Sequence, residues 1–279
     1  MRKEEIQNMQ NLYIFDLDGT LYEGKDHFDY YAELLMNEVN PSNRSLFWKD
    51  YEKMKAGDHV VAIGKAYDVK NDLAVTIDPI TLKVVEAHDW NGQKVIDIED
   101  IYGNSPVNFD FDNFVAIGDG WWLPFACAKH YGVLNCHPYY LKTKEYMVSD
   151  QFKLEAIPHL REFLLSLKKT DHIVLMTNSD KEDVLRLLKE LNLTEVFDQI
   201  ISSAKKPSRT KDIFVELQKL YELPFYQLVS VGDNFLNEIA PALLLDMKAV
   251  YISEHPHKTL HENLQQVSSI SDWMKEMDK

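Results

Sequence analysis

Tyr13-Ile14-Phe15-Asp16-Leu17-Asp18-Gly19-Thr20-Leu21 is the stretch that decides the fold of this 279-residue chain. Its apolar beginning, together with Leu12, is rich in aromatic and β-branched residues and predicts a strand buried on both faces. Asp16 and Asp18 follow, and residues two apart on a strand point to the same side. Gly19 then predicts a tight turn. We therefore expect two carboxylates side by side at the carboxyl end of a buried strand.

Apolar runs of the same kind return late in the chain, with helical periods between them. The predicted strands are His172–Met176, Leu228–Val231, Ala249–Ile252 and, more weakly, Gln199–Ser202. The predicted helices are Leu154–Leu167, Asp183–Leu191, Asp212–Leu220 and Ile239–Leu245. Strands that alternate with helices predict right-handed crossovers and a doubly wound parallel sheet, an α/β fold. Ligands bind such sheets at the carboxyl ends of the strands.

The stretch from residue 23 to residue 150 has a different pattern. Two helical segments, Phe28–Val39 and Ser45–Met54, are followed by a strand-rich part from Val60 to Ile101. A region of this length is too long for a loop in a compact domain. We interpret residues 23–150 as an inserted α+β domain, and residues 1–22 and 151–279 as the two parts of the core.

Charge and composition exclude several classes of protein. The 30 Lys and Arg against 45 Asp and Glu give a formal charge of −15, which disfavours non-specific nucleic-acid binding. No apolar run reaches the length of roughly 18 residues that spans a membrane, and the first residues lack the apolar core of a secretory signal. Cys127 and Cys136, the only cysteines, suit reduced, buried thiols better than a disulfide. We expect a cytoplasmic protein with no nucleic-acid or membrane partner.

Asp16 and Asp18 can divide the work of a catalyst, one as nucleophile and the other as general acid and base. The alternative is a solvated Asp-Gly turn that closes a strand. An apolar strand precedes the pair, and Thr20 and Leu21 follow it. This context favours a catalytic pair over a solvated turn. In this context the sequence resembles the haloacid dehalogenase-like (HAD) hydrolase superfamily, whose first motif is Asp-x-Asp-Gly-Thr-Leu. The match is unbroken from Phe15 to Leu21.

The second and third motifs of that superfamily have counterparts in the expected order. Thr177 follows an apolar run and matches the phosphate-binding hydroxyl of the second motif, with Asn178 beside it as a further phosphate-binding candidate. Lys206, directly before Pro207, matches the lysine of the third motif, and Lys205 remains an alternative.

The fourth motif is an acidic cluster after another strand. Asp233 follows the run that ends at Gly232, Asn234 is a supporting candidate, and Glu238 stands where the superfamily more often has Asp. Glu238 could contact the metal, a metal-bound water or only Lys206, or it could be an acid that merely favours a helix N-terminus.

The resemblance implies a Rossmann-like core, an inserted cap domain and a Mg²⁺ cofactor. Asp16 and Asp233 would supply side-chain metal ligands and Asp18 its backbone carbonyl, because hard oxygen ligands suit Mg²⁺. Asp16 would attack phosphorus to form an aspartyl-phosphate, and Asp18 would protonate the leaving oxygen. Thr177 and Lys206 would hold the equatorial oxygens.

Asp18 narrows the reaction class, because superfamily members that cleave carbon–halogen bonds have no need of this acid. We expect a phosphatase for a small phosphorylated metabolite. The alternatives are a phosphomutase that uses the same intermediate and a catalytically silent protein that binds phosphate or a partner. The superfamily's usual cap at this position is helical, so the strand-rich insertion leaves the substrate open.

Overall fold

The computed structural model describes residues 10–22, 24–110, 112–152, 154, 156–254 and 261–277. The chain divides into two compact units. We call Met1–Gly24 with Leu154–Lys279 the core unit, and Lys25–Lys153 the inserted unit. The sequence placed the corresponding boundaries after residues 22 and 150.

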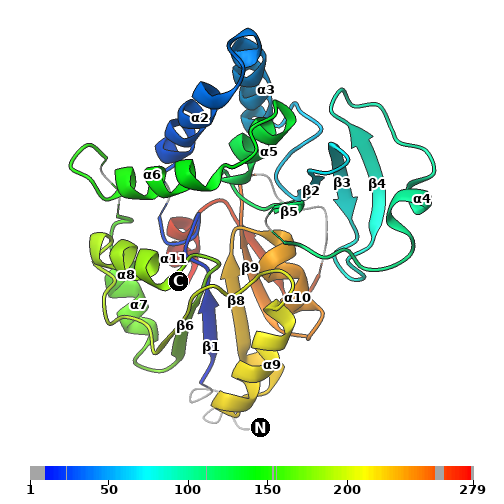
Figure 1. Cartoon of the computed structure of the whole chain (residues 1–279). Coiled ribbons are helices and arrows are strands. Elements are labelled where there is room, and N and C mark those ends of the chain that lie inside the picture. Colours follow the sequence, from blue (N-terminus) through cyan, green and yellow to red (C-terminus); the bar gives the residue numbers. More distant parts are fainter. Residues whose placement is uncertain are drawn as a thin grey trace. The chain divides into compact units, whose positions relative to one another are not determined.

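Six described strands of the core unit form one parallel sheet, in the order β10-β9-β8-β1-β6-β7 (Figure 1). They are β1 (Leu12–Phe15), β6 (His172–Met176), β7 (Gln199–Ile201), β8 (Leu228–Gly232), β9 (Lys248–Ile252) and β10 (Leu264–Val267). In the register of the sheet, Leu12 of β1 pairs with His172 on one side and with Leu228 on the other. The predicted α/β fold with a parallel sheet is confirmed, and β1 lies at its centre.

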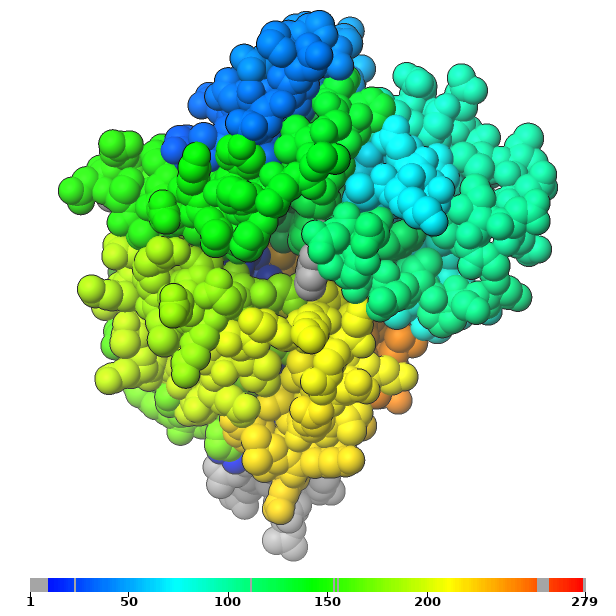
Figure 2. All heavy atoms as spheres, in the orientation of Figure 1, coloured from blue at the N-terminus to red at the C-terminus, as the bar shows by residue number. Residues whose placement is uncertain are grey.

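Helices connect these strands and cover both faces of the sheet. They are α7 (Leu160–Leu167), α8 (Lys181–Glu190), α9 (Thr210–Tyr221), the 3-10 turn η2 (Phe225–Gln227), the π-helical η3 (Phe235–Ile239), α10 (Ala240–Leu243) and α11 (Ile270–Met277). On one face, α9 and α10 lie over β1 and β8 (Figure 1), and the yellow atoms of the α9 region are in front in the space-filling view (Figure 2).

The central strand is buried on both faces because its side chains alternate. Leu12 and Ile14 enter the apolar cluster formed with α9 and α10. Tyr13 and Phe15 point the other way, and each has its ring about 6 Å from that of Trp273 in α11, with centroid distances of 6.0 and 6.1 Å. The continuous apolar run therefore marks a strand between two helical layers.

The structure differs from the predicted core in the bounds of two helices and in two further elements. The helix predicted from Leu154 begins only at Leu160, because Pro158 disfavours helical backbone in the residue before it. The helix predicted over Ile239–Leu245 is shorter, α10 (Ala240–Leu243), and the π-helical η3 precedes it. Strand β10 and helix α11 were not predicted.

The inserted unit has an antiparallel sheet with the order β4-β3-β2-β5 among its described residues. The strands are β2 (Lys65–Asp68), β3 (Leu73–Ile77), β4 (Val84–Asp89) and β5 (Phe114–Ile117). The helices are α2 (Asp26–Glu38), the 3-10 turn η1 (Pro41–Asn43), α3 (Arg44–Ala56), α4 (Ile98–Tyr102), α5 (Trp122–His130) and α6 (His137–Met147). Helix α2 packs against α3, α5 and α6. The insertion is therefore an α+β unit, as predicted.

Both cysteines, Cys127 and Cys136, are free and buried in the inserted unit. Among the described residues, no helix has the length and apolar character needed to cross a membrane.

Candidate active site

The candidate site lies where three neighbouring strands of the core unit end. Asp16 follows β1 and its backbone N–H still donates to the carbonyl of Val231 in β8, at 2.9 Å. Thr177 follows β6 and donates likewise to Ile201 of β7, at 2.9 Å. Asp233 comes directly after β8. Because parallel strands end at one edge of the sheet, their polar followers gather there.

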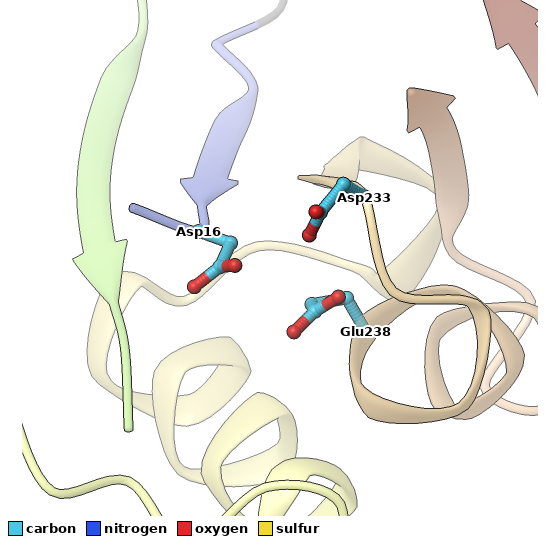
Figure 3. A group of neighbouring side chains, drawn as sticks. All are labelled: Asp16, Asp233 and Glu238. Carbon is cyan, nitrogen blue, oxygen red and sulfur yellow. The ribbon is translucent and has the colours of Figure 1, made fainter. Parts of the chain in front are cut away.

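Three carboxylates converge at this edge (Figure 3). One oxygen from each of Asp16, Asp233 and Glu238 lies within 4.8 Å of the other two. Asp16 is 7% exposed and Glu238 only 1%. Glu238, whose role the sequence left open, thus belongs to the same cluster as Asp16 and Asp233.

Lys206 is the cation of the cluster. Its Nζ lies 2.6 Å from Oδ1 of Asp16 and 2.6 Å from Oε1 of Glu238, and the side chain is 2% exposed. Burial works against the charge, but the two carboxylates outweigh it and raise the pKa of Lys206 above its usual value, so the ammonium stays protonated. Lys205, the alternative candidate, is exposed.

Burial and neighbouring charges shift the pKa values of the acids in this cluster. Burial raises the pKa of Asp16; Lys206 opposes this effect and the charge of Asp18 adds to it. Burial likewise raises the pKa of Glu238 to about 8, with Lys206 lowering it and Asp16 raising it. Three carboxylates that lie this close together repel one another in a place of low dielectric, and Lys206 contacts two of them, so the arrangement can accommodate a further cation.

Two glycines allow the carboxylates to approach the backbone closely. A Cβ on Gly19, whose φ is +74°, would lie 2.0 Å from Oδ2 of Asp233. A Cβ on Gly232 would lie 2.9 Å from Oε2 of Glu238. A side chain at either position would therefore push a carboxylate of the cluster out of place.

The turn after β8 fixes Glu238 through the backbone. Asn234 caps it: its Oδ1 accepts from the N–H groups of Leu236 at 3.1 Å and Asn237 at 3.0 Å. The N–H of Asn234 donates to Oε2 of Glu238 at 3.0 Å. Asn234, predicted as a supporting residue, therefore shapes the turn that presents Glu238.

Asn178 is bonded to the backbone of the lysine loop. Its Nδ2 donates to the carbonyl of Lys206 at 3.1 Å, and its Oδ1 accepts from the Lys206 N–H at 2.7 Å. Both ends of the amide thus hold Lys206, a role that the sequence did not indicate. Contact of Asn178 with phosphate stays a prediction. Thr177 is 1% exposed, and its hydroxyl accepts from the N–H of Ser179 at 3.1 Å.

Asp18 has two hydroxyl partners that sequence reasoning missed. Tyr22 donates through its hydroxyl to Oδ1 of Asp18 at 2.5 Å, and Ser179 donates to Oδ2 at 3.0 Å. The only available signal was position, because Tyr22 follows the first motif closely and Ser179 stands two residues after Thr177.

The donor set fits a hard divalent cation. Asp16, Asp233 and Glu238 offer only carboxylate oxygens, without the imidazole or thiolate that zinc prefers, and carboxylates of this kind suit Mg²⁺.

Three solved structures of low sequence identity share the fold. A haloacid dehalogenase-like family hydrolase from Xanthomonas campestris is 16% identical with a TM-score of 0.50, over 97% of this chain and 96% of that chain. An L-2-haloacid dehalogenase is 13% identical with a TM-score of 0.52, over 97% and 99%. The HAD hydrolase YfnB from Bacillus subtilis, bound to magnesium, is 11% identical with a TM-score of 0.53, over 97% and 99%.

No curated protein matches the chain. A family model described as haloacid dehalogenase-like hydrolase matches residues 10–243, which include β1, β6 and β8 and the carboxylates at their ends. The chain therefore belongs to the haloacid dehalogenase-like hydrolase family.

Proposed function

We propose that the protein is a Mg²⁺-dependent phosphatase that hydrolyses a small phosphomonoester through an aspartyl-phosphate on Asp16. The observation that carries the proposal is the cluster of Asp16, Asp233 and Glu238, in which the ammonium of Lys206 contacts Asp16 and Glu238. A carboxylate that attacks a phosphate dianion needs more positive charge than one lysine supplies.

The residues of the site divide the reaction between them. Asp16 attacks phosphorus and the ester oxygen leaves, taking a proton from Asp18. Asp18, now a carboxylate, removes a proton from the water that attacks the aspartyl-phosphate, which releases inorganic phosphate and restores Asp16. Thr177 and Lys206 hold phosphate oxygens as charge develops. Bound Mg²⁺ would supply charge neutralisation between the nucleophile and the phosphate.

A dehalogenase is the second candidate, since solved structures that share the fold carry that name. Their identities of 13 and 15% support the fold alone. A halide leaves without a proton, and a haloacid carries less charge than a phosphate dianion. Asp18, which accepts hydrogen bonds from Tyr22 and Ser179, is an acid that a dehalogenase does not need. The carboxylates of Asp16, Asp233 and Glu238 could hold a cation that a phosphate dianion needs. Both observations favour phosphoryl transfer.

An activity panel tests the proposal. The full chain is assayed with Mg²⁺ on 4-nitrophenyl phosphate, on metabolite phosphomonoesters and on 2-haloacids, with release of phosphate or halide as the readout. We expect phosphate release, strongest on one class of phosphorylated metabolite. Halide release with no phosphate release would identify a dehalogenase. Phosphoryl transfer between positions of one substrate, with little free phosphate, would identify a mutase. Inactivity on every substrate would indicate a silent binding protein.

A matched lysine pair tests the site itself. Lys206→Gln removes the buried ammonium, whereas Lys205→Gln removes its exposed neighbour and serves as control. We expect a loss of roughly 10²-fold or more in kcat/KM for the first variant and wild-type activity for the second. Equal activity of the two variants would contradict the assignment of Lys206. Cytoplasmic location stays a prediction from the sequence.

A further inference from the structure

Asp18 is held on both carboxylate oxygens by neutral hydroxyls. We propose that Tyr22 and Ser179 are positioning residues that aim Asp18 at the leaving oxygen and at the attacking water. The inference rests on the proposed phosphatase function. Its basis is the pair of bonds at 2.5 Å from Tyr22 to Oδ1 and at 3.0 Å from Ser179 to Oδ2.

The two hydroxyls come from different parts of the core unit and are themselves fixed. Tyr22 is 1% exposed and forms a β-bridge with Ala156. Ser179 is 7% exposed; its N–H donates to Oγ1 of Thr177, and its carbonyl accepts from Ser203 at 2.9 Å. A carboxylate bonded at both oxygens by two fixed partners has little freedom to rotate, which is the condition for efficient proton transfer.

Hydroxyl partners suit a group that must both give and take a proton. A hydroxyl donates to a carboxylate, and by rotating it accepts from a carboxylic acid. An ammonium only donates, and it therefore favours the ionised form alone. Among the described contacts, Lys206 lies against the nucleophile Asp16, and the hydroxyls of Tyr22 and Ser179 lie against Asp18.

Tyr22 also connects Asp18 to the chain segments that lead into and out of the inserted unit. Gly24 ends the first stretch of the core unit and Leu154 begins the second. The bridge between Tyr22 and Ala156 joins these two stretches. The hydroxyl that holds the acid thus belongs to the same segment through which the insertion is attached.

The test compares two substrates of nearly the same shape, 4-nitrophenyl phosphate and phenyl phosphate. The 4-nitrophenolate leaves readily without a proton, whereas phenolate depends more on an acid. For Tyr22→Phe and Ser179→Ala we expect kcat/KM on phenyl phosphate to fall roughly 10- to 100-fold, and on 4-nitrophenyl phosphate no more than about 3-fold. The value of kcat should fall on both substrates, because hydrolysis of the aspartyl-phosphate needs Asp18 as base.

Two controls separate positioning from stability. Ser179→Thr keeps a hydroxyl and should recover most of the activity on phenyl phosphate, and Tyr226→Phe removes an exposed tyrosine hydroxyl that is 57% exposed as a residue. Equal losses on both substrates, or wild-type values in both variants, would overturn the inference while leaving the phosphatase proposal standing. A wild-type protein that hydrolyses neither ester nor any metabolite phosphate would overturn the phosphatase proposal and the inference with it.

Discussion

Asp16 and Glu238 of the core unit are buried and Asp50 of the inserted unit is partly buried, yet their pKa values shift in opposite directions. In the core unit, Asp16 and Glu238 have raised pKa values, because burial and mutual repulsion exceed the help of Lys206. In the inserted unit, burial alone would raise the pKa of Asp50. Hydrogen bonds from Trp90 at 3.0 Å and Tyr131 at 2.7 Å instead hold that pKa below its usual range.

Asp72 of the inserted unit follows the same rule as Asp50. It accepts from the hydroxyl of Tyr67 at 2.5 Å and lies 2.8 Å from Nδ1 of His130, and these contacts outweigh burial and lower its pKa. His130 in turn stacks on Trp90 with a centroid distance of 3.8 Å. Asp50 and Asp72 thus each accept from more than one hydrogen-bond donor. The comparison teaches that hydrogen bonds favour the ionised acids of the inserted unit, whereas burial and neighbouring carboxylates work against ionisation in the core unit, as expected where stability is given up for function.

The largest effect is expected for Asp16→Asn. Loss of the nucleophile should lower kcat by roughly 10⁴-fold or more. The free energy of unfolding should stay within about 1 kcal/mol of the wild-type value, because Lys206 keeps Glu238 as a partner and a repelling charge is removed. Phosphate release and urea unfolding measure the two quantities. Unchanged phosphatase activity in this variant would refute the mechanism.

Removal of the metal tests whether the carboxylate cluster needs a bound cation for activity. Excess EDTA should abolish turnover and Mg²⁺ should restore it. In a thermal unfolding assay, Mg²⁺ at about 100 times its Kd should stabilise the wild-type protein by about 2.7 kcal/mol. Asp233→Asn should lose most of this stabilisation. Full activity in EDTA, or equal Mg²⁺ stabilisation of the two proteins, would remove the metal from the mechanism.

Gly19→Ala separates local strain from damage to the site. Both Gly19 (φ +74°) and Gly57 (φ +77°) are left-handed, but a Cβ at Gly57 meets nothing within 4 Å, whereas one at Gly19 meets Asp233. Each alanine variant should cost about 1–2 kcal/mol of unfolding free energy from backbone strain. Only Gly19→Ala should also lose Mg²⁺-dependent activity. Normal kcat/KM in that variant would show that the close approach to Asp233 is dispensable.

Asp50→Asn should have the smallest effect of these variants, a loss of unfolding free energy whose size depends on pH. Because the folded-state pKa of Asp50 is depressed, its stabilisation is present above the unfolded pKa of about 3.9 and is lost as the pH falls through the lower folded value. Near pH 7 we expect a loss of about 1–2 kcal/mol. Urea unfolding at pH 7 and near pH 3 should show the difference shrinking. The exposed Asp100→Asn serves as control, and a loss independent of pH would contradict the charge-based account.

The sequence located the parts of the site that depend on local pattern. An apolar run followed by an acid predicts both a buried strand and a carboxylate at its end, which is why Asp16 and Asp233 could be named. Strand β10 was not predicted because its sequence, Leu264-Gln265-Gln266-Val267, is more polar than that of a buried strand. The helix predicted from Leu154 begins later, at Leu160, because the apolar period continues across Pro158 although proline disfavours helical backbone in the residue before it.

Pairings between distant loops could not be predicted in the same way. The bonds between Asn178 and the Lys206 backbone, and between Ser179 and Asp18, depend on the conformation of loops that are far apart in sequence. Nothing in the local composition of either loop specifies the partner. Such contacts follow only once the sheet has set the order of its strands.

The central place of β1 also determines when the core can form during synthesis. Leu12 pairs with His172 and Leu228, and the whole inserted unit is made between the first of these positions and its partners. At about 5–20 residues per second, the ribosome needs on the order of 10–30 s to travel from β1 to β6. We expect the contiguous inserted unit to fold during this interval. The apolar β1 remains unpaired until β6 and β8 are synthesised, and we expect chaperones to protect it from aggregation.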